Sequence, residues 1–247
     1  MKTSIHIENK LISKPSRLGF KYHIKTFGCQ MNEHDSEKIA GIFNNDGMCK
    51  SDDIDQADIL FVNTCTIREN ADDKLYGTLG HLKKWKEQSP DRRLIVGGCA
   101  AQKDKELVRD RAPWVDVVIG THNTTDVINL LNQSEDWGPI TQIVEETSDI
   151  ETEILPVRES GFSAFVTIQI GCNNSCTFCI VPSVRGVEIS RRPSDIINEI
   201  KNLSNEGVKE ITLLGQNVNS YGRDLMIDNK RSPYFTQLLY KIHEIDG

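Results

Sequence analysis

Short apolar stretches that alternate with longer amphipathic ones place the strongest limit on how this 247-residue chain can fold. Such stretches, rich in Ile, Val, Leu and Phe, recur at residues 21–27, 57–63, 92–96 and 115–120. Each precedes a segment with helical spacing and charged faces. The last of these helices is expected at residues 125–131, where Asn123 and Thr124 can supply a cap. Alternating β and α elements favour a parallel sheet with helices on its faces.

Each of the first three apolar stretches is followed closely by a cysteine. Cys29, Cys65 and Cys99, here called the strand-end cysteines, lie 36 and 34 residues apart, which is about one βα unit each. Ligands of open parallel sheets bind outside the carboxyl ends of the strands, so these thiols are expected to meet at one edge and form a metal site. The alternative is that they are ordinary core cysteines. The CxxC pairs of structural zinc sites are absent from these loops.

A second group of three cysteines occupies eight residues after a strand-like stretch. Cys172, Cys176 and Cys179, here called the loop cysteines, have a spacing that would also fit one buried face of a helix. Gly171 and residues 173–175 favour turns and argue against that helix. Thiolates select iron–sulfur clusters, zinc or Cu(I). A four-iron cluster normally takes four cysteines, so a set of three leaves one iron open to a substrate.

Composition indicates a globular protein of a reducing compartment. Hydrophobic residues make up 38% of the chain, no stretch reaches the ~18 apolar residues of a membrane helix, and residues 1–20 lack the apolar core of a signal peptide. We therefore expect a cytoplasmic protein without a membrane partner. In that compartment seven cysteines indicate metal binding or catalysis more than disulfides. Six form the two sets, and Cys49 is left without a role.

The net charge of −7 is unevenly distributed. Residues 158–247 contain ten basic and ten acidic side chains, so the whole acidic excess lies in residues 1–157. Part of it is in the acidic stretch 145–153, which we interpret as a solvated linker.

The CxxxCxxC loop, with Phe178 before its last cysteine, resembles the cluster loop of the radical S-adenosylmethionine enzymes. Together with the strand-end cysteines it resembles the methylthiotransferase branch of that superfamily. The motifs that carry the resemblance are residues 26–32 (TFGCQMN), 63–65 (NTC), 97–102 (GGCAAQ) and 171–182 (GCNNSCTFCIVP). The resemblance implies that the strand-end cysteines hold an auxiliary [4Fe–4S] cluster bearing the sulfur to be inserted. It also implies that the loop cysteines hold a second [4Fe–4S] cluster, which generates a radical from S-adenosylmethionine next to Phe178.

The second half of the chain begins another series of strands and helices. Strands are expected at residues 165–170 and 210–214 and a helix at residues 194–205, with Pro193 before it and Ser194 as a plausible cap.

Polar residues after the loop complete the candidate site. Arg185 and Arg191 could hold a carboxylate or phosphate bidentately, although a solvated basic loop is the alternative. Gln216 and Asn217 carry amides suited to polar ligand edges, although such residues also form turns. The resemblance places both arginines and Glu188 near cofactor or substrate. We expect no classical acid or base catalyst, because the chemistry would occur at the clusters.

Residues 214–221 look like the branch that acts on isopentenylated adenosine beside the tRNA anticodon. The other branches act on threonylcarbamoyladenosine or on a ribosomal-protein aspartate. The implied reaction adds a methylthio group at C2 of the adenine, with S-adenosylmethionine as both methyl donor and radical source. The implied partners of a monomeric enzyme are the tRNA anticodon loop, a flavodoxin- or ferredoxin-like electron donor and a sulfur source. A non-catalytic two-cluster electron carrier is the alternative, but a carrier prefers fully ligated irons.

The expected class is α/β, with an open parallel domain followed by the first part of a radical S-adenosylmethionine partial (β/α) barrel. The expected division is a flexible N-terminus (1–20), the methylthiotransferase N-terminal domain (21–137), a linker (138–157) and the start of the core domain (158–247). By the resemblance, this last domain lacks later strands and a C-terminal RNA-binding domain. The 247-residue chain alone is therefore expected to be inactive, as a fragment or as one half of a complex.

Overall fold

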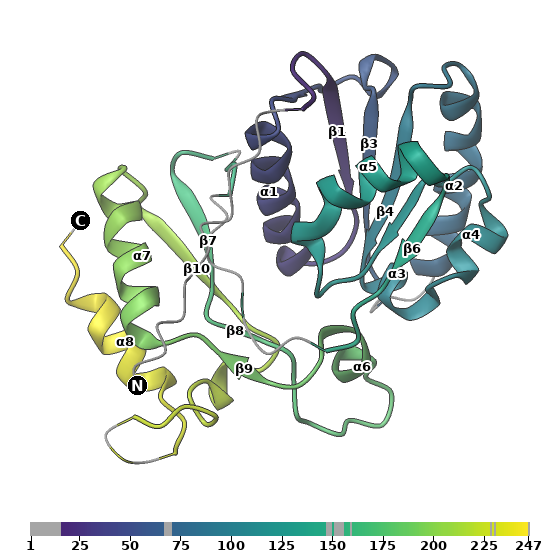
Figure 1. The fold of residues 1–247 in the computed structure, drawn as a ribbon. Coiled ribbons are helices and arrows are strands. Elements are labelled where there is room, and N and C mark those ends of the chain that lie inside the picture. Colours follow the sequence, from purple (N-terminus) through teal and green to yellow (C-terminus); the bar gives the residue numbers. More distant parts are fainter. Residues whose placement is uncertain are drawn as a thin grey trace, which may run out of the picture.

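The computed structural model describes residues 16–66, 71–146, 150, 156–158, 160–227, 229 and 231–246. Figure 1 shows two α/β units, a large sheet covered by helices on both faces and a smaller unit built on two strands.

The first unit is a six-stranded, all-parallel sheet. Its strands are β1 (Lys21–Thr26), β2 (Cys49–Lys50), β3 (Ile59–Thr64), β4 (Arg93–Gly98), β5 (Val117–Ile119) and β6 (Ile140–Gln142), in the order β2-β1-β3-β4-β5-β6. Every residue of β3 is buried, as expected for a central strand covered on both faces. Thr26 pairs with Asn63 and Thr64 pairs with Gly98, so β1, β3 and β4 end at the same edge.

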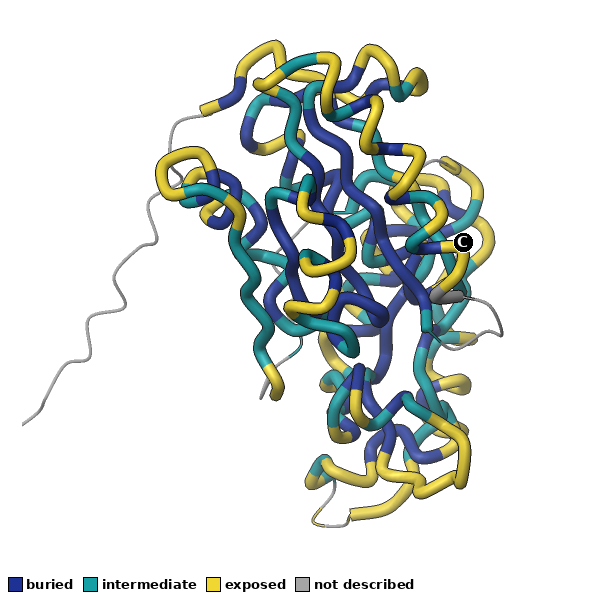
Figure 2. The backbone as a smooth tube through the Cα atoms, turned by 90° about the vertical axis from the view of Figure 1, so that its right-hand side faces the viewer, coloured by how far each residue is buried: buried dark blue, intermediate teal, exposed yellow. Residues whose placement is uncertain are grey.

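Helices cover both faces of this sheet. The helices on one face are α1 (Gln30–Asn45) and α5 (Val127–Trp137), and those on the other are α2 (Ala71–Glu87), α3 (Cys99–Asp104) and α4 (Leu107–Arg111). Short 3-10 helices span Ile54–Gln56 and Thr124–Asp126. Each face packs its own apolar core, and Figure 2 shows that buried residues follow the strands while exposed ones gather in loops and outer turns.

The second unit pairs β7 (Ser163–Thr167) with β10 (Glu210–Leu214) in parallel. Its helices are α6 (Val181–Arg185), α7 (Pro193–Asn205) and α8 (Phe235–His243), with a 3-10 turn at Val218–Ser220. A short antiparallel pair joins β8 (Gln169–Ile170) to β9 (Ile189–Ser190). Apolar side chains of β7, α7 and α8, including Val166, Ile200 and Leu238, form its core.

The two units touch along α1. The ring of His34 lies 6.3 Å from the ring of Phe165 on β7 in an edge-to-face arrangement, and the Val157 backbone N–H donates to the Glu37 carbonyl at 2.9 Å. Within the described ranges, no helix combines the length and the apolar character needed to cross a membrane.

The expected strands of the first unit are confirmed to within about two residues, and β10 has the expected bounds. The strand expected at 165–170 divides into β7 and β8. Three strands were not expected, β2, β6 and β9, because each is only two or three residues long. Strands β2 and β6 also lie at the sheet edges, and β6 lies inside the expected linker 138–157. Of the acidic stretch 145–153, residues 147–149 and 151–153 lie outside the described residues.

Two local expectations were wrong. Ser194 does not cap α7, because the helix already begins at Pro193 and the Ser194 hydroxyl bonds to Asp195. Asn123 does not cap the following helix, because its side-chain oxygen accepts from the Gly120 N–H at 3.1 Å.

Of the expected flexible N-terminus, residues 1–15 lie outside the described residues. Arg17 is buried and pairs with Asp46 at 3.1 Å, which fixes this part of the segment.

Replacement of Phe61 tests the packing of the central sheet. Its ring is fully buried on β3, lies 6.3 Å from the Phe43 ring and fills the space left by Gly97 on β4. We expect Phe61→Ala to lower the free energy of unfolding by ~3–5 kcal/mol in urea denaturation, because it opens a cavity. The control is Trp137→Ala, whose side chain is 83% exposed and should change stability by no more than ~0.5 kcal/mol. Equal losses in the two variants would contradict the packing.

Candidate metal centres

The strand-end cysteines lie at one edge of the sheet. Cys29 immediately precedes α1, Cys65 directly follows β3, and Cys99 is the first residue of α3 after β4. Because β1, β3 and β4 are neighbours and end together, their three loops converge. Cys29 is half-buried, whereas Cys65 and Cys99 are 5% and 0% exposed.

Two glycines allow these loops to approach each other. Gly28 has a φ of 125°, and a Cβ at this position would lie 2.8 Å from the Cβ and 3.1 Å from the Sγ of Cys65. Gly98 has a φ of 88°, and a Cβ there would lie 2.4 Å from the Asn63 side-chain oxygen. Both the backbone conformation and the lack of space require glycine. The first two cysteine loops are thus in direct contact.

A buried pair of amides fixes the same loops. The Asn32 Nδ2 donates to the Asn63 Oδ1 at 3.1 Å and to the Thr64 carbonyl at 2.8 Å. The Asn63 Nδ2 donates in return to the Asn32 carbonyl at 2.8 Å and to the Ser36 hydroxyl at 2.9 Å. Asn32 and Asn63 belong to the cysteine motifs, but nothing in the motifs themselves indicates a role for them. Their position shows that they hold the loops that present Cys29 and Cys65.

An arginine from the second unit reaches this edge. Arg185 ends α6, is 6% exposed and pairs with Asp35 on α1 at 2.7 Å. Burial raises the pKa of the Cys99 thiol, and the positive charge of Arg185 offsets part of that rise. Burial lowers the pKa of Arg185 itself, but Asp35 and Cys99 outweigh this and raise it above its ordinary value. The guanidinium therefore stays charged beside the thiol.

His122, in the loop after β5, lies beside the same arginine. Burial lowers the pKa of His122, and the Arg185 charge lowers it further. Its Nε2 is buried without a hydrogen-bond partner in the described part of the chain. Neither His122 nor Asp35 was expected at the site, because each is a single polar residue in a segment without a motif.

The loop cysteines lie on an irregular loop, so the helix alternative is wrong. The β8–β9 pair closes the base of this loop, and a Cβ at Gly171 would lie 1.9 Å from the Val187 carbonyl oxygen. Cys172 is buried, whereas Cys176 and Cys179 are exposed. The neighbouring Phe178 ring is 96% exposed.

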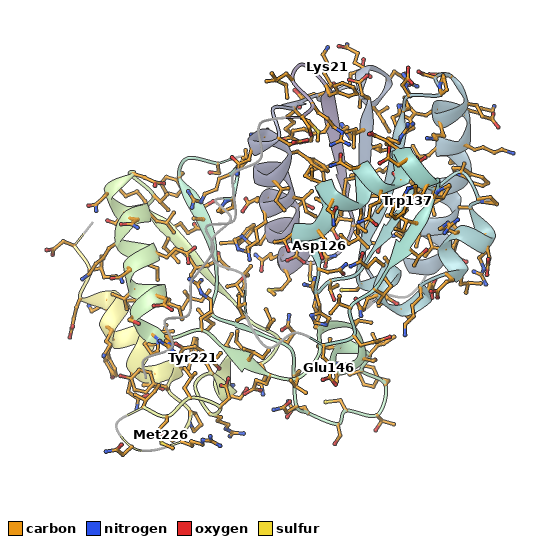
Figure 3. The ribbon with its side chains drawn as sticks, in the orientation of Figure 1. Lys21, Asp126, Trp137, Glu146, Tyr221 and Met226 are labelled. Carbon is orange, nitrogen blue, oxygen red and sulfur yellow. The ribbon has the colours of Figure 1, made fainter. Side chains whose placement is uncertain are left out.

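The other expected cofactor-binding residues lie apart from Arg185. Glu188 is buried and accepts from the Ser220 hydroxyl at 2.6 Å. Asn217 precedes the same 3-10 turn, and the Oε1 of Gln216 is buried without a partner among the described residues. Arg191 is held by Glu199 at 2.6 Å and by the Thr167 carbonyl at 2.8 Å. The Tyr221 hydroxyl donates to the Arg191 carbonyl at 2.8 Å. Figure 3 shows Tyr221 in the second unit and Glu146 near α6.

The cysteine thiols are donors of the type that binds iron–sulfur clusters. Within the described ranges, no three His, Cys, Asp or Glu side chains are close enough to hold a single metal ion. A four-iron cluster is larger than one ion, so its thiolate ligands stand further apart. Three thiols at one edge, with buried N–H groups of Arg185 beside them, match such a group in donor chemistry.

Comparisons with known proteins match both units. The uncharacterized protein family UPF0004 matches residues 21–120, and the radical SAM superfamily matches residues 166–246. The tRNA-2-methylthio-N(6)-dimethylallyladenosine synthases of Mycobacterium bovis and Cutibacterium acnes are 48% and 50% identical to this chain. Each alignment covers 92% of this chain and, respectively, 45% and 46% of the relative. The chain therefore spans about half the length of the curated relatives it matches.

Solved structures show a related fold. The radical S-adenosylmethionine methyltransferase TsrM from Kitasatospora setae, with cobalamin and a [4Fe-4S] cluster bound, matches with a TM-score of 0.51 at 11% identity. The match covers 82% of this chain and 48% of that chain. A second structure of the same methyltransferase, with tryptophan substrate and a SAM analog, gives a TM-score of 0.50 at 10% identity, over 81% of this chain and 48% of that chain.

The order of alkylation tests the placement of the thiols. In the iron-free protein at pH 8, iodoacetamide should modify the exposed Cys49, Cys176 and Cys179 first, as followed by peptide mass spectrometry. Cys99 should react last, because it is fully buried and burial raises the pKa of its thiol. In urea all seven should react at similar rates. Modification of native Cys99 as fast as Cys49 would contradict the structure.

Proposed function

We propose that this chain forms the cluster-binding part of an enzyme that methylthiolates tRNA. The chain belongs to the radical S-adenosylmethionine methylthiotransferases. The substrate would be N6-isopentenyladenosine beside the anticodon, and the methylthio group would be added at C2 of the adenine. The observation that carries the proposal is the presence of two separate sets of three thiols, one at the sheet edge and one on a loop of the adjoining unit. A three-thiol set leaves one iron of a four-iron cluster open to another ligand.

The strand-end cysteines would hold the auxiliary [4Fe–4S] cluster, and the loop cysteines would hold the cluster that binds S-adenosylmethionine. When bound, the second cluster and S-adenosylmethionine supply a 5′-deoxyadenosyl radical, while the first supplies the sulfur. The chain keeps the two sets near each other through α6, which follows the loop and packs against α3. Thr121, in the loop after β5, bridges the two helices: its hydroxyl donates to the Val184 carbonyl of α6 at 2.6 Å, and its backbone N–H donates to the Gln102 side-chain oxygen of α3 at 2.9 Å.

Residues of the second unit would bind the cofactor. Glu188 can accept from the amino group of S-adenosylmethionine, since a buried carboxylate favours a cationic partner. Gln216 and Asn217 can bind its polar edges, and the buried Oε1 of Gln216 is an acceptor that such a ligand would satisfy. Arg191 would position the segment through its bonds to β7 and α7, and Phe178 would cover the cofactor once it is bound.

The same proposal names the partners of the enzyme. An anticodon-loop base can be splayed out of its stack and held in a pocket, which a base inside a duplex cannot. A flavodoxin- or ferredoxin-like donor would reduce the cluster, and a sulfur source would restore the auxiliary cluster after each turnover.

Iron content tests the two sites separately. After anaerobic reconstitution the chain should bind about eight irons, as two four-iron clusters. Replacing either set with three alanines should leave about half the iron, because each set would hold its own cluster. Reductive cleavage of S-adenosylmethionine should be lost only with the loop set. Retention of all the iron by either variant would contradict the assignment, and Cys49→Ala is the control that should change nothing.

Substrate choice can be tested in a chimera in which this chain replaces the matching segment of the Mycobacterium bovis relative. Nucleoside mass spectrometry should detect methylthio product from tRNA that carries the isopentenyl group. The rate on unalkylated tRNA should be at least about tenfold lower, because the apolar group contributes ~1–3 kcal/mol of binding. The same chimera with Cys65→Ala should still cleave S-adenosylmethionine without forming the product. Methylthiolation of an aspartate peptide at a comparable rate would assign the chain to the branch that acts on a ribosomal-protein aspartate.

A further inference from the structure

In sequence Arg185 is part of the second unit, but its side chain lies beside the strand-end cysteines of the first unit. It is the last residue of α6, six residues after Cys179. Its Nη1 nevertheless pairs with the Asp35 carboxylate on α1 of the first unit at 2.7 Å. An arginine from one unit thus crosses to the other and is buried there at 6% exposure.

One side of this guanidinium is unsatisfied. Nη1 is held by Asp35, but Nη2 is buried and has no hydrogen-bond partner among the described residues. A buried donor without a partner is destabilising, and more so when it is charged. The guanidinium also forms a side-chain hydrogen bond with the Cys99 thiol, whose charged form Arg185 favours. The unpaired donor therefore belongs to a guanidinium that lies beside the strand-end cysteines, where a ligand held by those cysteines would supply the missing acceptor.

The surroundings favour an anionic, sulfur-rich ligand. Within the described ranges, the positive charge of Arg185 lowers the pKa of the Cys99 thiol, whereas Asp35 and Cys65 raise it. His122, another polar side chain beside Arg185, is half-buried, and its buried Nε2 has no partner among the described residues. Gly186 lets the histidine ring approach, since a Cβ there would lie 3.3 Å from the His122 Cε1.

We propose that Arg185 is a positioning residue of the auxiliary cluster site, and that its Nη2 donates a hydrogen bond to a sulfur of the group held by the strand-end cysteines. Asp35 fixes the guanidinium in place. This inference rests on the proposed function, because it needs a cluster at those cysteines. It gives Arg185 a role different from that of Glu188, which bonds to Ser220 of the 3-10 turn, and of Arg191, which bonds to Thr167 of β7.

The reduction potential of the auxiliary cluster is the property that should respond. Cluster potentials depend on net charge, on hydrogen bonds to the sulfurs and on solvent exposure. A guanidinium that neutralises charge and donates to sulfur stabilises the reduced, more negative cluster. Loss of Arg185 should therefore make the cluster harder to reduce, whereas loss of the negative charge of Asp35 should make it easier. The two variants shift the potential in opposite directions, which general damage to the site would not do.

The experiment uses the full 247-residue chain with the three loop cysteines replaced by alanine, so that only the auxiliary cluster remains. Redox titration followed by electron paramagnetic resonance gives the midpoint potential, and iron analysis gives the occupancy. In Arg185→Gln the ratio of reduced to oxidised cluster at a fixed potential should fall about tenfold, equivalent to ~59 mV for one electron. In Asp35→Asn it should rise severalfold. Arg185→Lys keeps the charge and should recover part of the loss.

The chain contains a matched control. Arg17 and Asp46 form another buried ion pair, near the start of β1 and therefore at the opposite edge of the sheet, where Figure 3 places Lys21. Arg17→Gln and Asp46→Asn make the same charge changes away from the cysteines. They should change the ratio of reduced to oxidised cluster by no more than about twofold, equivalent to a shift of ~18 mV in the potential.

The outcomes separate the inference from the proposed function. An unchanged potential in Arg185→Gln at full iron content, or equal shifts in the control pair, would overturn the role of Arg185. If Arg185→Gln binds no iron, the iron content of Arg185→Lys decides whether Arg185 has the proposed role. A cluster that returns with the positive charge supports the role, and an Arg185→Lys protein that also binds no iron contradicts it. A parent protein that binds no iron with Arg185 intact would instead contradict the auxiliary cluster itself.

Discussion

The parallel register of β1, β3 and β4 is the constraint on which the rest of the site depends. Their aligned carboxyl ends bring together three cysteines that are more than thirty residues apart in sequence. Gly28 and Gly98 then allow contacts that any larger residue would prevent, and the Asn32–Asn63 amide pair holds the loops in that arrangement. A slip of one strand would separate the thiols, so the packing of the sheet core directly determines the geometry of the proposed metal site.

The second constraint is the ion pair that joins the two units. Arg185 leaves the segment that follows the loop cysteines and pairs with Asp35 beside the strand-end cysteines. A buried ion pair contributes little to stability when the cost of desolvating both charges is included. Its value is therefore in specificity, because the pair fixes α6 against α1 and so relates one thiol set to the other. The same contact keeps a positive charge where a sulfur-bearing anion would bind.

Much of this could be predicted from the sequence. Strong apolar runs located the four longer or fully buried strands, and the common position of the cysteines after β1, β3 and β4 predicted their meeting at one edge. The very short β2 and β6 carry too few residues to show a pattern. The position of Arg185 could not be predicted, because its partner Asp35 lies 150 residues away and only tertiary packing brings them together. The Asn123 side chain bonds to Gly120 and to the Gln142 carbonyl of β6 instead of capping a helix, and the contact with β6 depends on the tertiary fold.

The central claim is that one edge of the sheet holds a cluster on three thiols with Arg185 beside it. An anaerobic crystal structure of the iron-reconstituted chain tests this most directly. The account predicts electron density for a four-iron cluster bonded to Cys29, Cys65 and Cys99, with the Arg185 Nη2 within hydrogen-bond distance of one of its sulfurs. Free thiols at that edge, a single zinc ion, or an Arg185 side chain turned toward the loop cysteines would contradict it.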